Sequence, residues 1–139
     1  MGSGESGVIA PLPTSYSPLA GAAFGMALEL LSPDEQWVVR QALAAITQGA
    51  YLDDESFAER IGVERAELAA LLADWPRVDD TRRDAPAGFA INNCLNEICY
   101  ELRIEPTEWN RWFDVPRDEV AAVYRRWAML KGWSTPGVR

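Results

Sequence analysis

Apolar residues recur along this chain at the three- and four-residue spacing of amphipathic helices, and the alternation typical of strands is weak throughout. Residues that start and stop helices divide the pattern into segments. Ser32, Pro33 and Glu35 form a capping box with a proline in the first turn, and Gly49 is a stop signal. We therefore predict a helix over 33–48. Its apolar stripe comprises Trp37, Leu43, Ala44 and Ile46.

Two shorter helices are predicted next. Asp53 is a suitable N-cap for a helix over 54–61, and Gly62 supplies a left-handed residue for the turn into a third helix over 64–74. A polar linker over 77–88 then interrupts the helical pattern.

The same succession of signals recurs later in the chain. It predicts helices over 89–102, 106–113 and 116–131, the last ended by Gly132. A further helix over 17–31 precedes the first set, and we expect its apolar residues to cover the contact between the two sets. These residues are Phe24, Leu28 and Leu31. The chain is therefore predicted to be all-α.

The two sets of helices are related by a constant offset in sequence. When the chain is shifted by 52 residues, 37–75 falls on 89–127 without a gap, and apolar positions match by type. Because equivalent apolar spacing demands equivalent burial, we predict two tandem three-helix repeats that superpose and share one core. Trp75 and Trp127 should both be buried. The identical pairs include Leu43 and Leu95, Ile46 and Ile98, Val63 and Val115, Arg65 and Arg117, and Trp75 and Trp127.

The length of 139 residues suits one compact core. We therefore predict one helical domain over 17–139 after a flexible lead over 1–16. Within that domain we assign the N-terminal helix to 17–31, repeat one to 33–76, a linker to 77–88, repeat two to 89–132 and a tail to 133–139.

The second and third helices of repeat one carry a turn motif. Ala58 is small where two helices cross, and Gly62 follows four residues later at the turn. This pattern resembles the helix-turn-helix unit of bacterial regulators. The resemblance implies a compact helical hairpin and DNA binding through the start of its second helix. The residues expected to pack the hairpin are Ile61, Val63 and Leu68.

The start of that second helix is poorly suited to DNA. Glu64 and Glu67 stand beside Arg65, and carboxylates there would repel phosphate. In repeat two, Asn110 and Asp114 replace the small residue and the glycine of the motif. We therefore favour a hairpin used for packing or protein contact over a DNA reader.

The charge of the chain is concentrated in its first half. Residues 1–76 carry 11 acidic and 3 basic side chains, whereas 77–139 carry 10 of each, so the net charge of −8 comes from the first half. Such a field disfavours nucleic acid as a partner. Any polyanion would be expected at the basic C-terminal repeat.

The composition offers little for catalysis. Histidine is absent, which removes the usual proton shuttle and the commonest metal ligand. Cys94 and Cys99 are five residues apart on one predicted helix, a spacing that suits neither a disulfide nor a shared metal, so we expect partly buried, reduced thiols. We predict a non-enzyme with no cofactor and no metal. No apolar run is long enough for a membrane span, so we expect a cytoplasmic protein.

Two groups in repeat two are candidate partner-binding residues. The first could form an aromatic and basic surface, or else a core with its arginines reaching solvent. The second lies on one helix face, as a solvated face, a buried polar network or a partner contact. The first group is Trp109, Trp112, Tyr124, Arg125 and Arg126, and the second is Asn92, Asn93, Asn96 and Glu97.

The function expected from these features is protein–protein interaction. A regulatory or accessory subunit fits an acidic helical domain without catalytic residues, and its partner is another protein or a second copy in a homodimer. The alternative is a helix-turn-helix transcriptional regulator that binds DNA through its basic C-terminal repeat.

Overall fold

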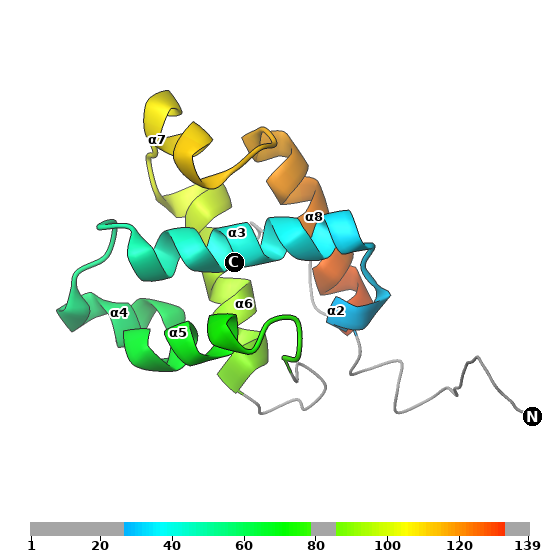
Figure 1. Ribbon diagram of the computed structural model, residues 1–139, viewed down its shortest axis with the longest axis horizontal. Helices are drawn as coiled ribbons and strands as arrows, with labels where there is room; N and C mark the ends of the chain where they lie inside the picture. The colour runs from blue at the N-terminus through cyan, green and yellow to red at the C-terminus, as the bar shows by residue number, and fades with distance from the viewer. Residues whose placement is uncertain (1–26, 79–85, 133–139) are drawn as a thin grey trace, which may run out of the picture.

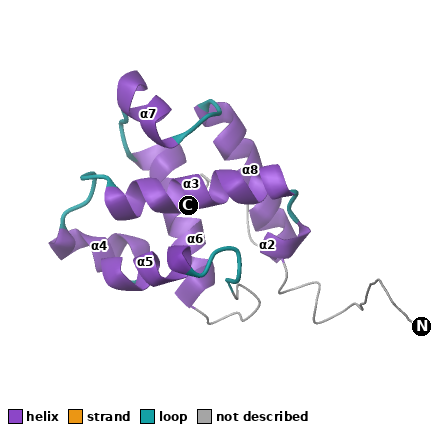
Figure 2. Ribbon diagram, viewed as in Figure 1, coloured by secondary structure: helices purple, strands orange, loops and turns teal. Residues whose placement is uncertain are grey.

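The computed structural model describes residues 27–78 and 86–132, and every regular element within these stretches is helical (Figure 2). The predicted all-α class is confirmed for this part of the chain. None of its helices is long and apolar enough to cross a lipid bilayer. Outside the described residues lie the predicted lead over 1–16, residues 17–26 of the predicted N-terminal helix including Phe24, and the predicted tail over 133–139.

The helices form two successive sets (Figure 1). In the first half of the molecule, α2 covers Ala27–Leu30, α3 covers Pro33–Gln48, α4 covers Asp54–Ile61 and α5 covers Arg65–Ala73. In the second half, α6 covers Pro86–Asn96 and runs into a π-helical segment, η1, at Glu97–Glu101. The last two helices are α7 at Pro106–Trp112 and α8 at Arg117–Lys131.

The predicted caps of the first half are present. Ser32 Oγ accepts a hydrogen bond from the Glu35 amide at 3.1 Å, and the Glu35 carboxylate accepts one from the Ser32 amide at 2.8 Å. Asp53 Oδ1 accepts from the Ser56 amide at 2.9 Å at the start of α4. Gly62 ends α4 with φ of +96°, a left-handed conformation that glycine adopts without steric cost.

The second half departs from the prediction at two places. α6 begins at Pro86 rather than at residue 89, which shortens the predicted linker. At the other end of this helix the Leu102 amide donates to the Glu97 carbonyl at 2.8 Å, five residues back, and this defines the π-helical segment. The turn after α7 also differs from the turn after α4, because α7 ends at Phe113 with φ of −125°.

Packing between the two halves is reciprocal. The third helix of each half contacts the first helix of its own half, in the pairs α5–α3 and α8–α6. The second helix of each half instead contacts the first helix of the other half, in the pairs α4–α6 and α7–α3. Figure 1 shows α3 crossing the middle of the molecule with α4 and α5 on one side and α7 on the other. The described halves therefore share one core.

The second and third helices of the two halves start at the offset of 52 residues seen in the sequence. α4 and α7 begin at 54 and 106, and α5 and α8 begin at 65 and 117. Trp127 is completely buried, whereas its counterpart Trp75 is only partly buried against the core. The superposition of the two predicted repeats stays a prediction.

Several other expected core residues are buried. Leu28 and Leu31, at the described end of the predicted N-terminal helix, are buried, and α2 packs on α8. Cys94 and Cys99 are both buried free thiols. Burial raises the pKa of the Cys94 thiol, and burial likewise raises that of Cys99 to about 12. Both are therefore protonated at neutral pH.

Candidate functional site

The polar face predicted on α6 lies between helices rather than in solvent. Asn93 Nδ2 donates to the Ile61 carbonyl at the end of α4 at 2.8 Å. One turn further on, the buried carboxylate of Glu97 accepts two hydrogen bonds from the Arg60 guanidinium. These contacts join the first helix of the second half to the hairpin of the first half. They fit the buried-network interpretation.

The remaining two amides of this face also point inward. Asn92 Oδ1 accepts a hydrogen bond from the Tyr124 hydroxyl of α8 at 2.6 Å. Asn96 is buried, and its Nδ2 has no partner among the described residues. A buried amide without a partner destabilises the fold. All four polar residues are therefore engaged in, or enclosed by, the helix packing.

The predicted aromatic surface is divided between core and boundary positions. Trp109 is 8% exposed, its Nε1 donates to the Val115 carbonyl at 2.8 Å, and its ring stacks on Phe113 with centroids 4.3 Å apart. Tyr124 is 1% exposed. These side chains stabilise α7 and α8 and do not present a free surface.

Trp112 takes part in a hydrogen-bonded chain between the halves. Its Nε1 donates to the Tyr51 hydroxyl at 3.0 Å, and that hydroxyl donates to Glu108 Oε1 at 3.0 Å. Burial and the hydrogen bond to the Glu108 carboxylate raise the pKa of Tyr51 above its usual value of 10.0. These hydrogen bonds anchor α7 to the loop that follows α3.

The two arginines of the predicted surface are exposed. Arg126 Nε lies 3.3 Å from Glu35 Oε2 on α3, whereas Arg125 has no ion pair within the described part of the chain. With Trp109 and Tyr124 buried, the predicted residues do not form one aromatic and basic patch. The structure matches the other interpretation, a core with solvent-exposed arginines.

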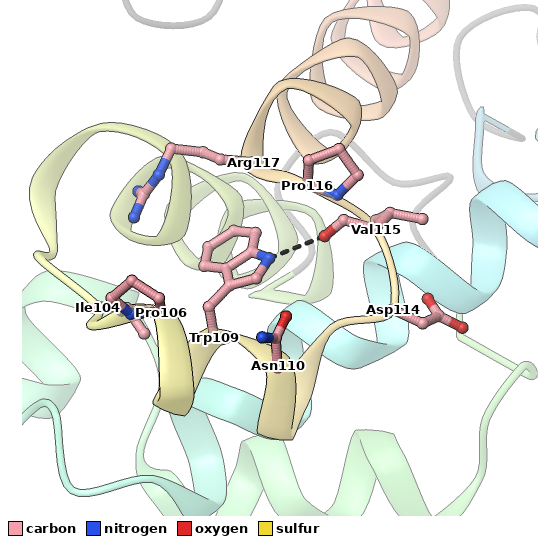
Figure 3. Close-up of a pocket in the computed structure, with 8 residues that line it drawn as sticks. All are labelled: Ile104, Pro106, Trp109, Asn110, Asp114, Val115, Pro116 and Arg117. Atoms are coloured by element: carbon pink, nitrogen blue, oxygen red, sulfur yellow. Dashed lines mark hydrogen bonds between the residues drawn. The ribbon is translucent and has the colours of Figure 1, made fainter.

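An open cleft of about 540 Å³ lies where α7 turns into α8 (Figure 3). The Arg117 guanidinium lies 4.8 Å from the centroid of the Trp109 ring and donates from Nη1 to the Ile98 carbonyl. Figure 3 shows Asp114 at the opposite end of the cleft from Arg117, with its carboxylate directed away. The cleft is lined by Ile104, Pro106, Trp109, Asn110, Asp114, Val115, Pro116 and Arg117.

A cleft of similar size, about 520 Å³, occurs at the α4–α5 hairpin. Arg65 lies there 4.4 Å from the centroid of the Phe57 ring, and both residues are 52 positions before their counterparts, Arg117 and Trp109. The Arg65–Arg117 identity was part of the predicted repeat, but no functional role was predicted for either arginine. The available signal was that an arginine is conserved between the two repeats, although most of the matching positions are apolar core residues. The cleft is lined by Thr47, Asp54, Phe57, Glu64, Arg65, Ala66 and Ala69.

A third depression, an acidic groove of about 380 Å³, runs between α3 and α8. Three of its carboxylates, Asp34, Asp114 and Glu119, are exposed and form no ion pair within the described residues. Trp37 lies among them. The groove is lined by Asp34, Glu35, Trp37, Val38, Asp114, Val115, Glu119 and Val123.

The prediction that Trp37 belongs to the apolar stripe buried on α3 is wrong, because its side chain is 49% exposed. Its counterpart Phe89 is 47% exposed, so both aromatic residues lie at the edge of the core. With the Gln41 amide oriented to satisfy both of its atoms, Gln41 accepts from Trp37 Nε1 at 3.1 Å and donates to Asp114 Oδ1 at 3.3 Å. Arg40 lies over the Trp37 ring, 5.4 Å from its centroid. The indole is thereby held in position beside the carboxylates.

The described residues contain no group of three or more cysteine, aspartate and glutamate side chains placed to hold a metal ion. The packed residues of the α4–α5 hairpin, Ile61, Val63 and Leu68, are buried as predicted. Arg65, which would face DNA in a helix-turn-helix reader, instead donates to backbone carbonyls. No protein-family model matches this chain, and searches of curated proteins and of solved structures found no match.

Proposed function

We propose that this chain is a non-enzymatic protein–protein interaction module, acting as a regulatory or accessory subunit, that binds a basic segment of its partner in the acidic groove between α3 and α8. The observation that supports this proposal is the half-exposed indole of Trp37 beside the carboxylates of Asp34, Asp114 and Glu119, which form no ion pair within the described residues. Tryptophan is enriched at the energetic centres of interfaces.

The chemistry of the groove suits lysine and arginine. Carboxylates form charge-assisted hydrogen bonds with both side chains, and the face of an indole attracts cations. Arg40 already illustrates that attraction from within the chain. The net charge of −8 would further increase the association rate with a basic partner.

The test uses a labelled acetyl-(Lys-Ala-Arg)₄-amide peptide and measures its binding by fluorescence anisotropy. Neutralising the groove in the D34N/D114N/E119Q variant should weaken binding about tenfold, because charge-assisted hydrogen bonds are lost. Trp37→Ala should weaken it similarly.

Matched controls separate the groove from general charge attraction. The variant E55Q/E59Q/E101Q removes the same number of exposed carboxylates outside the groove, and Phe89→Ala removes the counterpart of Trp37. Both should bind the peptide nearly as the unaltered protein does. Equal weakening by the groove and control variants would contradict the proposal.

The alternative, a helix-turn-helix transcriptional regulator using the basic C-terminal repeat, predicts a different result. Duplex DNA should then shift in a gel at low salt and be released as salt is raised. That outcome, together with no peptide binding, would replace the proposed function.

A further inference from the structure

Each nitrogen of the Arg65 guanidinium donates a hydrogen bond within the first half. It donates from Nη1 to the Thr47 carbonyl at 2.8 Å and from Nη2 to the Leu52 carbonyl at 2.7 Å. Its Nε donates to Asp54 Oδ1 at 3.0 Å. A carboxylate at the first residue of α4 thus lies on the arginine that covers the Phe57 ring.

The Arg117 guanidinium has the same setting but fewer acceptors. It covers the Trp109 ring and donates to the Ile98 carbonyl, and no other acceptor for it occurs among the described residues. The position of Asp54 is taken by Pro106, which is also the first residue of its helix and offers no carboxylate. Within residues 27–78 and 86–132, Nε and Nη2 of Arg117 therefore have no hydrogen-bond partner, and Arg117 lines an open cleft.

We infer that the α7–α8 cleft binds a carboxylate, which takes on Arg117 the place that Asp54 occupies on Arg65. The first half provides the template, because it shows a carboxylate on the equivalent arginine with an aromatic ring beneath. Arginine is suited to this role because its donors form a planar fork. Apart from Asn110 and Asp114, the cleft is lined by apolar and aromatic side chains around this charged group, as ligand sites commonly are.

The other charges near the cleft allow such a ligand. Asp114 lines the cleft but points away from Arg117 at its opposite end (Figure 3). Glu105 and Asp118 flank the lining residues Pro106 and Arg117 in the sequence, but both are exposed and neither lines the cleft. The carboxylate can come from the C-terminus of a peptide or from an aspartate or glutamate side chain.

Nuclear magnetic resonance titrations at low ionic strength test the inference. The probes are acetyl-Gly-Gly-Gly with a free carboxylate, acetyl-Gly-Glu-Gly-amide and acetyl-Gly-Gly-Gly-amide. The two carboxylate peptides should move the Arg117 Nε–H and Trp109 Nε1–H resonances saturably, and the tighter of the two identifies the source. The neutral peptide should leave both resonances in place.

Two substitutions exchange the properties of the clefts. Pro106→Asp should supply Arg117 with the internal carboxylate and weaken probe binding about tenfold or more, as loss of a charged hydrogen bond predicts. Pro106→Ala removes the ring without adding a carboxylate and is the matched reference, so P106D should bind the probes about tenfold more weakly than P106A. Asp54→Ala should make the Arg65 Nε–H resonance respond to the same probes.

Three outcomes would overturn the inference. The first is no carboxylate-dependent shift in the unaltered protein, and the second is unchanged binding in the folded P106D variant. The third is tighter binding of inorganic phosphate than of either peptide carboxylate, which would indicate a general anion site. Because Arg117 and Pro106 lie outside the acidic groove, these outcomes are separate from failure of the basic-peptide test.

Discussion

The α4–α5 and α7–α8 hairpins hold an arginine over an aromatic ring in the same way but surround it differently. Arg65 donates to backbone carbonyls and to the Asp54 carboxylate, whereas Arg117 donates to one backbone carbonyl, although each arginine lines a cleft of similar size. The shared arrangement stabilises each hairpin. In both cases the arginine covers an aromatic ring of its own hairpin and donates to a carbonyl near the end of the helix that precedes the hairpin. The unshared part leaves hydrogen-bonding capacity for a ligand. Differences between similar halves therefore locate candidate binding sites better than their common features do.

The contacts that cross between the halves show a second difference. Asn93 on α6 and Glu97 at the start of η1 form hydrogen bonds with α4. The residue of α3 that corresponds to Glu97 is Ala45, which is buried. Polar contacts fix α4 against the second half, and Tyr51 with Trp112 fixes α7 against the first. Equivalent helix contacts are thus made with different chemistry.

The largest expected effect contrasts the equivalent tryptophans. Trp127→Ala should lower the free energy of unfolding by about 3 to 5 kcal/mol, because it empties a completely buried site. Trp75→Ala should cost only about 1 to 2 kcal/mol, because Trp75 is partly exposed. Urea denaturation followed by circular dichroism measures both values. Equal losses would show that the two positions are energetically equivalent despite their difference in burial.

The arginine comparison should give the next largest difference. Arg65→Ala should lower the free energy of unfolding by about 2 to 3 kcal/mol, because a carboxylate and several carbonyls lose their donors. Arg117→Ala should cost about 1 kcal/mol, since one carbonyl is affected. The same denaturation experiment applies, with Arg125→Ala as an exposed control expected near zero. A larger loss at Arg117 than at Arg65 would contradict the ranking.

Alanine substitutions at the turns after α4 and α7 should reveal the difference in backbone strain between the two turns. Gly62→Ala should cost about 1 to 2 kcal/mol, because a β-carbon is strained at φ of +96°. Asp114→Ala, at the corresponding position of the second turn, should change stability by about 0.5 kcal/mol or less, since Asp114 is exposed. Thermal unfolding of both variants provides the measurement. A similar loss at both sites would indicate that the two turns share the same strain.

The smallest effect concerns Tyr51, which joins the halves. Its pKa is raised in the folded protein by burial and by Glu108, so the stability it contributes is present below pH 10.0 and is lost as pH rises through the folded-state pKa. The urea midpoint should therefore fall between about pH 9 and about pH 11. Tyr51→Phe should reduce that slope. An unchanged slope would show that Tyr51 does not control it.

Local signals in the sequence predicted most of the helix boundaries. The capping box at Ser32 and Glu35, the Asp53 cap and the left-handed Gly62 depend on residues within one turn, and each was found as predicted. The start of α6 at Pro86 was missed because the surrounding linker is polar. The π-helical turn was also missed, since no local signal distinguishes it from an ordinary helix end.

Burial and site chemistry were less accessible, because they depend on distant partners. Glu97 is buried against Arg60, 37 residues earlier in the chain, and helix periodicity carries no such information. Trp37 continues an apolar stripe, but about half of its surface is left uncovered by the other helices. Arg117 was identified by its match to Arg65, yet only the three-dimensional contacts show that its acceptors differ.

The reciprocal packing has a consequence for the autonomy of each half. If one half were produced alone, its first helix would expose the side that the second helix of the other half covers in the intact chain. Its own second helix would lose its contacts with the first helix of the other half. Two copies of such a fragment would bury both surfaces only by exchanging their second helices in a symmetric pair. In the intact chain the linker makes this exchange intramolecular. We therefore expect the two halves to unfold together in a single transition.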